Sequence, residues 1–168
     1  NTIEVTGVIT MTNDKSRVLL LKKLKRITSP PPPGLAFYDF EHVEGDKVKD
    51  TSTSDNDGTL VNGPQIVPGK SGKAVKFDGE KSYLQLPNMG VQPVVTIALW
   101  MNMTGLGKDP FGSSILHGEG WTWGDLHWLV VNSSSNIAIA INGGGDMHSQ
   151  SKIIPKLMKK WVHVAVVY

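Results

Sequence analysis

The chain has 168 residues, enough for one sizeable hydrophobic core but too few for two full domains. Its 17 basic and 15 acidic side chains leave a formal charge of +2, which by itself indicates neither a nucleic-acid partner nor a membrane surface. Cysteine is absent, which excludes disulfides and thiolate chemistry, and no stretch approaches the roughly 18 apolar residues of a transmembrane helix.

The first 27 residues predict a β-hairpin. Two strand-like runs, Ile3–Thr12 and Arg17–Ile27, flank the turn-forming residues 12–15. The second run also fits a short amphipathic helix, because its leucines occur at helical spacing. We expect a strand and keep the helix as the alternative.

Basic side chains are concentrated in this hairpin. Such a cluster is typical of a solvated face that keeps an edge strand from pairing with other chains. Contact with an anionic polymer or lipid surface is the alternative. The basic residues are Lys15, Arg17, Lys22, Lys23, Lys25 and Arg26.

Residues 28–34 include four consecutive prolines and mark a domain boundary. Proline cannot donate to a β-ladder and favours a stiff polyproline II spacer. We therefore expect three parts: a hairpin at 1–27 that ends a preceding domain or acts as a pairing arm, a linker at 28–34, and a β-domain at 35–168.

Short strands separated by turn signals recur from Leu35 onward. The chain is rich in Gly and Pro as well as Val, Ile and Thr, and it shows almost no helical periodicity. Alternation of apolar and polar residues is clearest in Tyr83–Leu86 and Ile137–Ile141. We expect an all-β antiparallel sandwich. Its predicted strands are Leu35–Glu41, Gly58–Val61, Lys73–Asp78, Tyr83–Leu86, Val94–Met103, Ser114–His117, Leu126–Val131, Ile137–Ile141 and Trp161–Tyr168.

Several motifs resemble the laminin-G-like, concanavalin A-like jelly roll. The most specific is Pro68–Gly79 followed by Ser82–Pro87, which is similar to the family signature around its Phe-Asp-Gly turn. Gly34–Glu41 resembles the first strand of the family, and Lys160–Tyr168 resembles a late one. The resemblance spans about residues 34–168 and implies a jelly-roll sandwich in a secreted protein.

The resemblance also implies missing strands. In the family, further strands follow the one that Lys160–Tyr168 resembles. We therefore expect a sandwich that is incomplete at its C-terminus and completed by another segment or chain, because an open apolar edge promotes aggregation.

Four carboxylates are candidate ligands for a structural calcium ion. Asp50, Asp55 and Asp57 belong to an acidic turn, and Asp78 belongs to the Phe-Asp-Gly turn. Calcium takes oxygen ligands of this kind, and similar jelly rolls often carry one. The alternative is that these side chains only accept hydrogen bonds from nearby backbone groups.

A glycine-broken, tryptophan-rich segment at 118–128 is the candidate ligand site. Aromatic faces beside polar groups suit sugar rings, which have apolar faces and hydroxyl rims. The loop at 142–146 lies where sandwich folds place recognition loops. Trp100 and Trp128 are expected in the core instead. The candidate ligand-binding residues are Trp121, Trp123, Asp125, His127, Asn142 and Asp146.

No catalytic pattern emerges from the sequence. The five histidines lack zinc-ligand spacing, and there is no Gly-x-Ser-x-Gly motif. A glycosidase needs paired carboxylates. The candidate concave strands, Val94–Met103, Leu126–Val131 and Trp161–Tyr168, contain neither Asp nor Glu.

The sequence therefore predicts a non-catalytic, extracellular binding module within a larger protein. Its expected partner is a carbohydrate or an extracellular protein, as in cell adhesion, and not nucleic acid. The alternative is a structural subunit that forms homo- or hetero-oligomers by strand sharing. A glycoside hydrolase, accessory or catalytic, is the more distant alternative.

Overall fold

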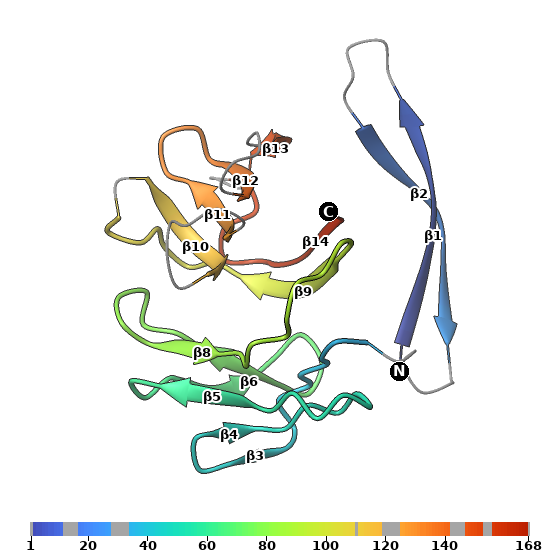
Figure 1. Cartoon of the computed structure of the whole chain (residues 1–168). Helices are drawn as coiled ribbons and strands as arrows, with labels where there is room; N and C mark the ends of the chain where they lie inside the picture. The colour runs from blue at the N-terminus through green and yellow to red at the C-terminus, as the bar shows by residue number, and fades with distance from the viewer. Residues whose placement is uncertain are drawn as a thin grey trace.

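The computed structural model describes residues 2–11, 17–27, 34–109, 111–118, 125–141, 147–152 and 156–167. In these residues every regular element is a strand, all strand pairs are antiparallel and no helix occurs, which confirms the expected all-β class (Figure 1). None of the described residues forms a helix that is long and apolar enough to cross a membrane. The strands are β1 (Thr2–Met11), β2 (Arg17–Ile27), β3 (Val43–Glu44), β4 (Lys47–Val48), β5 (Gly58–Val61), β6 (Gln65–Pro68), β7 (Lys73–Lys76), β8 (Tyr83–Gln85), β9 (Thr96–Asn102), β10 (Gly112–His117), β11 (Leu126–Val131), β12 (Asn136–Ile141), β13 (Met147–Lys152) and β14 (Trp161–Val167).

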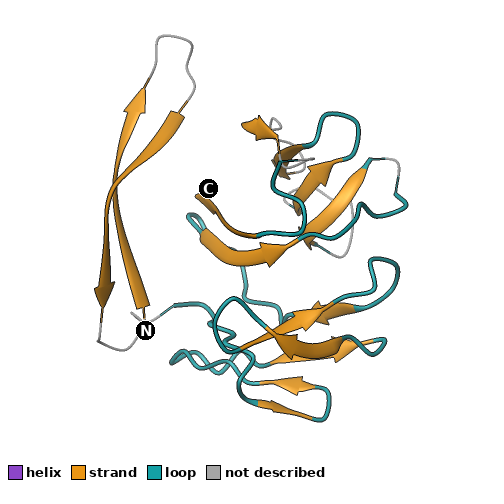
Figure 2. Ribbon diagram, turned by 180° about the vertical axis from the view of Figure 1, so that it is seen from behind, coloured by secondary structure: helices purple, strands orange, loops and turns teal. Residues whose placement is uncertain are grey.

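Strands β1 and β2 form a hairpin, so the prediction of a strand over Arg17–Ile27 is confirmed and the helical alternative is wrong. The register pairs Val5 with Leu24 and shifts between Thr6 and Gly7, where a bulge interrupts the ladder. The hairpin is a sheet of its own and stands beside the other sheets in both Figure 1 and Figure 2.

One layer of the structure consists of the sheet β3-β4-β5-β8 and the β6–β7 hairpin. Val48 on β4 is fully buried and lies opposite Gly58 on β5. Strands β3 and β4 were not predicted, because runs of two residues are too short to show an alternating pattern, and the four-residue strand β6 was also missed.

The second layer combines the sheet β10-β11-β12-β13 with a two-stranded ribbon, β9 and β14. Its core centres on Trp128, Ile139 and Val164, which come from β11, β12 and β14. Along β9, Ile97 and Leu99 pack against this core, and the residues between them are exposed. The ribbon therefore packs face to face on the four-stranded sheet.

The two tryptophans expected in the core have different environments. Trp128 is 2% exposed, which confirms that it lies in the core. Trp100 is 45% exposed, so its prediction was wrong. Strand alternation is the reason, because neighbours of the inward-facing Leu99 must face the other way. On that outer face the Trp100 and His163 rings pack edge to face, with their centroids 5.2 Å apart. Lys70 Nζ lies 5.6 Å from the centre of the Trp100 ring.

The predicted strand Leu35–Glu41 is absent, and this is the main error in the predicted elements. The Phe37 amide donates to the Asp50 carboxylate, and its carbonyl accepts from Thr51, so the segment is tied to a loop and joins no ladder. The other predicted strands, from Gly58 onward, are present with ends shifted by at most two residues. Strand β13 was not predicted.

Candidate functional site

Asp50 is the centre of the first candidate region, the acidic turn. Its side chain is 1% exposed, yet both carboxylate oxygens accept hydrogen bonds. Burial alone would raise the pKa of Asp50, but the hydrogen bonds, led by that of Phe37, outweigh burial and hold the pKa below its usual value. The donors are Phe37 N (2.8 Å), Ser52 N (2.8 Å), Ser52 Oγ (2.8 Å) and Asn56 N (2.9 Å).

Asp57 and Asp55 belong to the same turn as Asp50 and make hydrogen bonds and ion pairs of their own. Asp57 Oδ1 accepts from the Asp50 amide at 2.9 Å, and this bond is the main reason why the pKa of Asp57 is lowered. Lys49 Nζ lies 2.8 Å from Asp55 Oδ1 and 3.2 Å from Asp57 Oδ1. Nearby, the Tyr38 hydroxyl donates to the Asn56 carbonyl, and burial raises the pKa of Tyr38 to about 12.

Asp78, the fourth candidate calcium ligand, organises a different turn. Its Oδ1 accepts from the backbone amides of Glu80, Lys81 and Ser82 and from the Ser82 hydroxyl. These bonds, with the Ser82 amide first, hold the pKa of Asp78 well below its usual value. Within the described ranges, no three His, Asp or Glu side chains are grouped so that they could hold a metal ion. Calcium binding stays a prediction.

Two histidines meet where strand β10 ends and strand β11 begins. The register places His117 opposite His127, and their rings lie edge to face with centroids 4.8 Å apart. His127 is 1% exposed. Burial lowers its pKa most and His117 lowers it further, whereas Asp125 opposes the shift. The Gly118 amide donates to the Leu126 carbonyl at 2.9 Å and closes this end of the hairpin.

This strand end brings together described residues that flank the predicted ligand-binding segments. Leu126, which begins β11, pairs with Ile141, which ends β12. Residues 119–124 and 142–146 therefore continue from neighbouring strand ends. Of the predicted ligand residues, Asp125 and His127 lie at this edge, whereas Trp121, Trp123, Asn142 and Asp146 lie outside the described residues. His117 was not among the predicted ligand residues, although its cross-strand pairing with His127 could be guessed from the hairpin.

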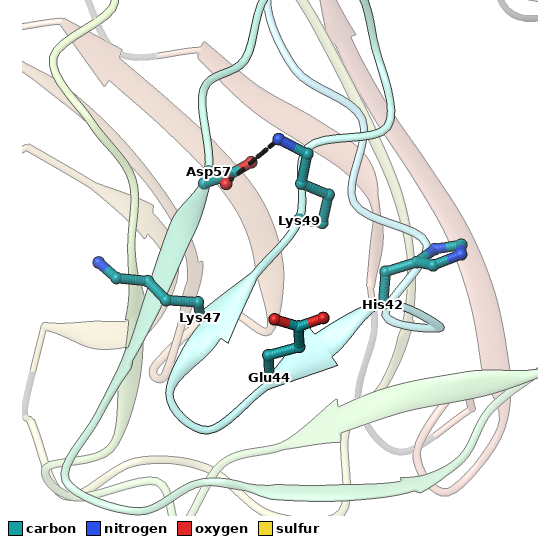
Figure 3. A pocket seen from close by; sticks show the side chains of 5 residues that line it. All are labelled: His42, Glu44, Lys47, Lys49 and Asp57. Atoms are coloured by element: carbon teal, nitrogen blue, oxygen red, sulfur yellow. Dashed lines mark hydrogen bonds and ion pairs between the residues drawn. The ribbon is translucent and has the colours of Figure 1, made fainter.

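A small polar hollow of about 210 Å³ lies over β3, β4 and the start of β5 (Figure 3). Lys49 and Asp57 form an ion pair across it, and the Lys47 ammonium donates to the Thr59 hydroxyl at 2.8 Å. Within the wall, Lys49 and Asp57 thus neutralise one another. Its lining residues are His42, Glu44, Lys47, Lys49 and Asp57, and all except Asp57 were missed because β3 and β4 are too short to predict.

Comparisons with known proteins assign no family to the chain. No protein-family model matches it, and neither the curated proteins nor the solved structures give a match.

Proposed function

We propose that the chain is a non-catalytic, extracellular binding module whose ligand is a carbohydrate. The fold proposed for it is a laminin-G-like, concanavalin A-like sandwich. Two observations support this fold: a β9–β14 ribbon that packs on the β10–β13 sheet, and a family-like signature, Pro68–Gly79, that spans the β6–β7 turn, β7 and the Phe-Asp-Gly turn.

The observation that carries the proposed site is the shared strand end of β10, β11 and β12. The pairing of Leu126 with Ile141 brings the chain just after residues 119–124 beside the chain just before residues 142–146, and these two segments carry the sequence's best ligand-binding candidates. Loops at one end of a rigid sheet are a common location for binding sites. We therefore propose that residues from both segments bind one ligand together.

The side chains proposed for this site suit a sugar. Trp121 and Trp123 supply aromatic faces for the apolar side of a pyranose ring. Asp125 and the exposed His117 supply hydrogen-bonding groups for its hydroxyls. Strands β9, β11 and β14 contain neither Asp nor Glu, so a paired-carboxylate hydrolase mechanism has no support there.

A glycan array with the full chain tests this proposal. We expect the double variant Trp121→Ala/Trp123→Ala to lose binding by about tenfold or more, as the loss of two aromatic contacts implies. Trp100→Ala is the control, because it removes a half-exposed tryptophan from the β9–β14 ribbon. Unchanged glycan binding by the double variant would contradict the proposed site.

A second candidate function is assembly with further copies of the chain. It is favoured by the outer face of the β9–β14 ribbon, where Trp100 and Val167 are 45% and 59% exposed. The two strands pair with each other and with no other described strand. Exposed apolar side chains beside open strand edges promote strand addition from another chain.

A further inference from the structure

A hollow of about 300 Å³ lies between the start of the β6–β7 hairpin and the turn that follows β7. It belongs to the first layer of the molecule, whereas the proposed ligand edge belongs to the β10–β13 sheet. Its wall combines one aromatic ring with several polar side chains. The residues that line it include Gln65, Lys76, Phe77, Asp78 and Ser82.

Two tight turns hold the walls of this hollow in place. Asn62 and Gly63 both adopt positive φ, at 60° and 67°, and so form the sharp connection from β5 to β6. The Asn62 side-chain amide donates to the Lys81 carbonyl at 2.8 Å, which ties this connection to the turn after β7. The Asp78 carboxylate fixes that second turn through its four hydrogen bonds. A ligand would therefore meet walls that are already ordered, which reduces the entropic cost of binding.

Phe77 provides the apolar part of the wall. It directly follows β7, and 44% of its surface remains exposed. Gln65 and Lys76 are register partners on β6 and β7, so their polar groups lie at the same end of the hairpin. We infer that this hollow binds one neutral pyranose ring, with Phe77 against the ring face and Gln65, Lys76 and Asp78 at its hydroxyls.

The charges in the hollow favour a neutral sugar over an acidic one. Lys76 and Asp78 carry opposite charges and leave no net attraction for a carboxylate. Because the four turn bonds all use Asp78 Oδ1, Oδ2 is the oxygen that can accept from a ligand hydroxyl. A volume of about 300 Å³ lies at the lower end of the range for ligand pockets and suits a single ring. This inference rests on the proposed carbohydrate function and adds a second subsite to it.

Titration of the full chain with methyl glycosides of glucose, galactose and mannose, followed by protein NMR, tests the inference. We expect at least one glycoside to shift the amide signals of residues 62–82, and Phe77→Ala to weaken that binding by about tenfold. Tyr83→Ala is the matched control, because Tyr83 is a 48% exposed aromatic on neighbouring β8 that does not line the hollow. The control should bind as the unaltered chain does.

The outcomes separate this inference from the proposed function. If Phe77→Ala binds normally and Trp121→Ala/Trp123→Ala loses binding, the hollow is no subsite and the β10–β13 edge remains. If only Phe77→Ala loses binding, the hollow is confirmed and the edge is not the site. If Tyr83→Ala weakens binding as much as Phe77→Ala does, or none of the glycosides shifts residues 62–82, the inference is overturned.

Discussion

At the scale of single residues, Asp50 shows how a buried charge can organise a loop. A carboxylate that is 1% exposed is costly unless donors surround it, and Asp50 has donors from residues 37, 52 and 56. These donors come from both ends of the loop, so one side chain fixes a segment that has no ladder of its own. This arrangement explains why Leu35–Glu41 is ordered without being a strand.

Removing this carboxylate should destabilise the protein. Asp50→Ala leaves three part-buried backbone amides, those of Phe37, Ser52 and Asn56, without this acceptor, at a cost of up to about 1–3 kcal/mol for each unsatisfied group. We expect the free energy of unfolding, measured with urea, to fall by roughly 2–4 kcal/mol. Asp55→Asn serves as the control, because the Asp55 side chain is 85% exposed, pairs with Lys49 at the surface, and has a φ of 57° that asparagine also tolerates. A loss no larger than that of the control would refute the role given to Asp50.

At the scale of elements, the start of β10 depends on a close approach of two backbones. A Cβ built on Gly112 would lie 2.8 Å from the Val130 carbonyl oxygen and 2.4 Å from Leu129 Cδ1. The Leu129 side chain could adopt another rotamer, but the Val130 carbonyl oxygen belongs to a paired strand and cannot move without disturbing the ladder. The glycine therefore permits the pairing of Gly112 with Val131.

Substitution of this glycine tests the close approach. Gly112→Ala should lower the free energy of unfolding by about 1–3 kcal/mol, the usual cost of overpacking. Gly105→Ala is the control, since a Cβ at Gly105 meets no atom within 4 Å. Thermal unfolding followed by circular dichroism would compare the two variants. Equal melting temperatures would mean that β10 and β11 lie further apart than described.

At the scale of the whole molecule, contacts of lysine side chains link the two layers. Lys70 on the β6–β7 turn lies over Trp100 on β9, and Lys108 pairs with Glu80 on the turn after β7. Cation–π contacts and surface ion pairs of this kind each contribute only about 0.2–1 kcal/mol. The buried cluster of Trp128, Ile139 and Val164 belongs to the second layer. Apolar side chains on the ribbon's outer face therefore stay exposed.

This exposure predicts self-association. Sedimentation velocity over a wide concentration range should show oligomers of the unaltered chain, and Trp100→Lys/Val167→Lys should reduce them by making the outer face polar. Val91→Lys is the control, because Val91 is 97% exposed but lies in a loop. A chain that is monomeric at every concentration would argue against the assembly function.

The sequence by itself determined the all-β fold class, the hairpin at 1–27 and most strands from Gly58 onward, because alternation and turn residues are local signals. It also placed Trp128 in the core. Only the tertiary structure decided that Trp100 faces outward, that Asp50 binds Phe37, and that residues 119–124 and 142–146 continue from neighbouring strand ends. The Phe77 hollow likewise depends on two turns that meet only in the folded chain. These features depend on contacts between residues far apart in the sequence, which no local pattern records.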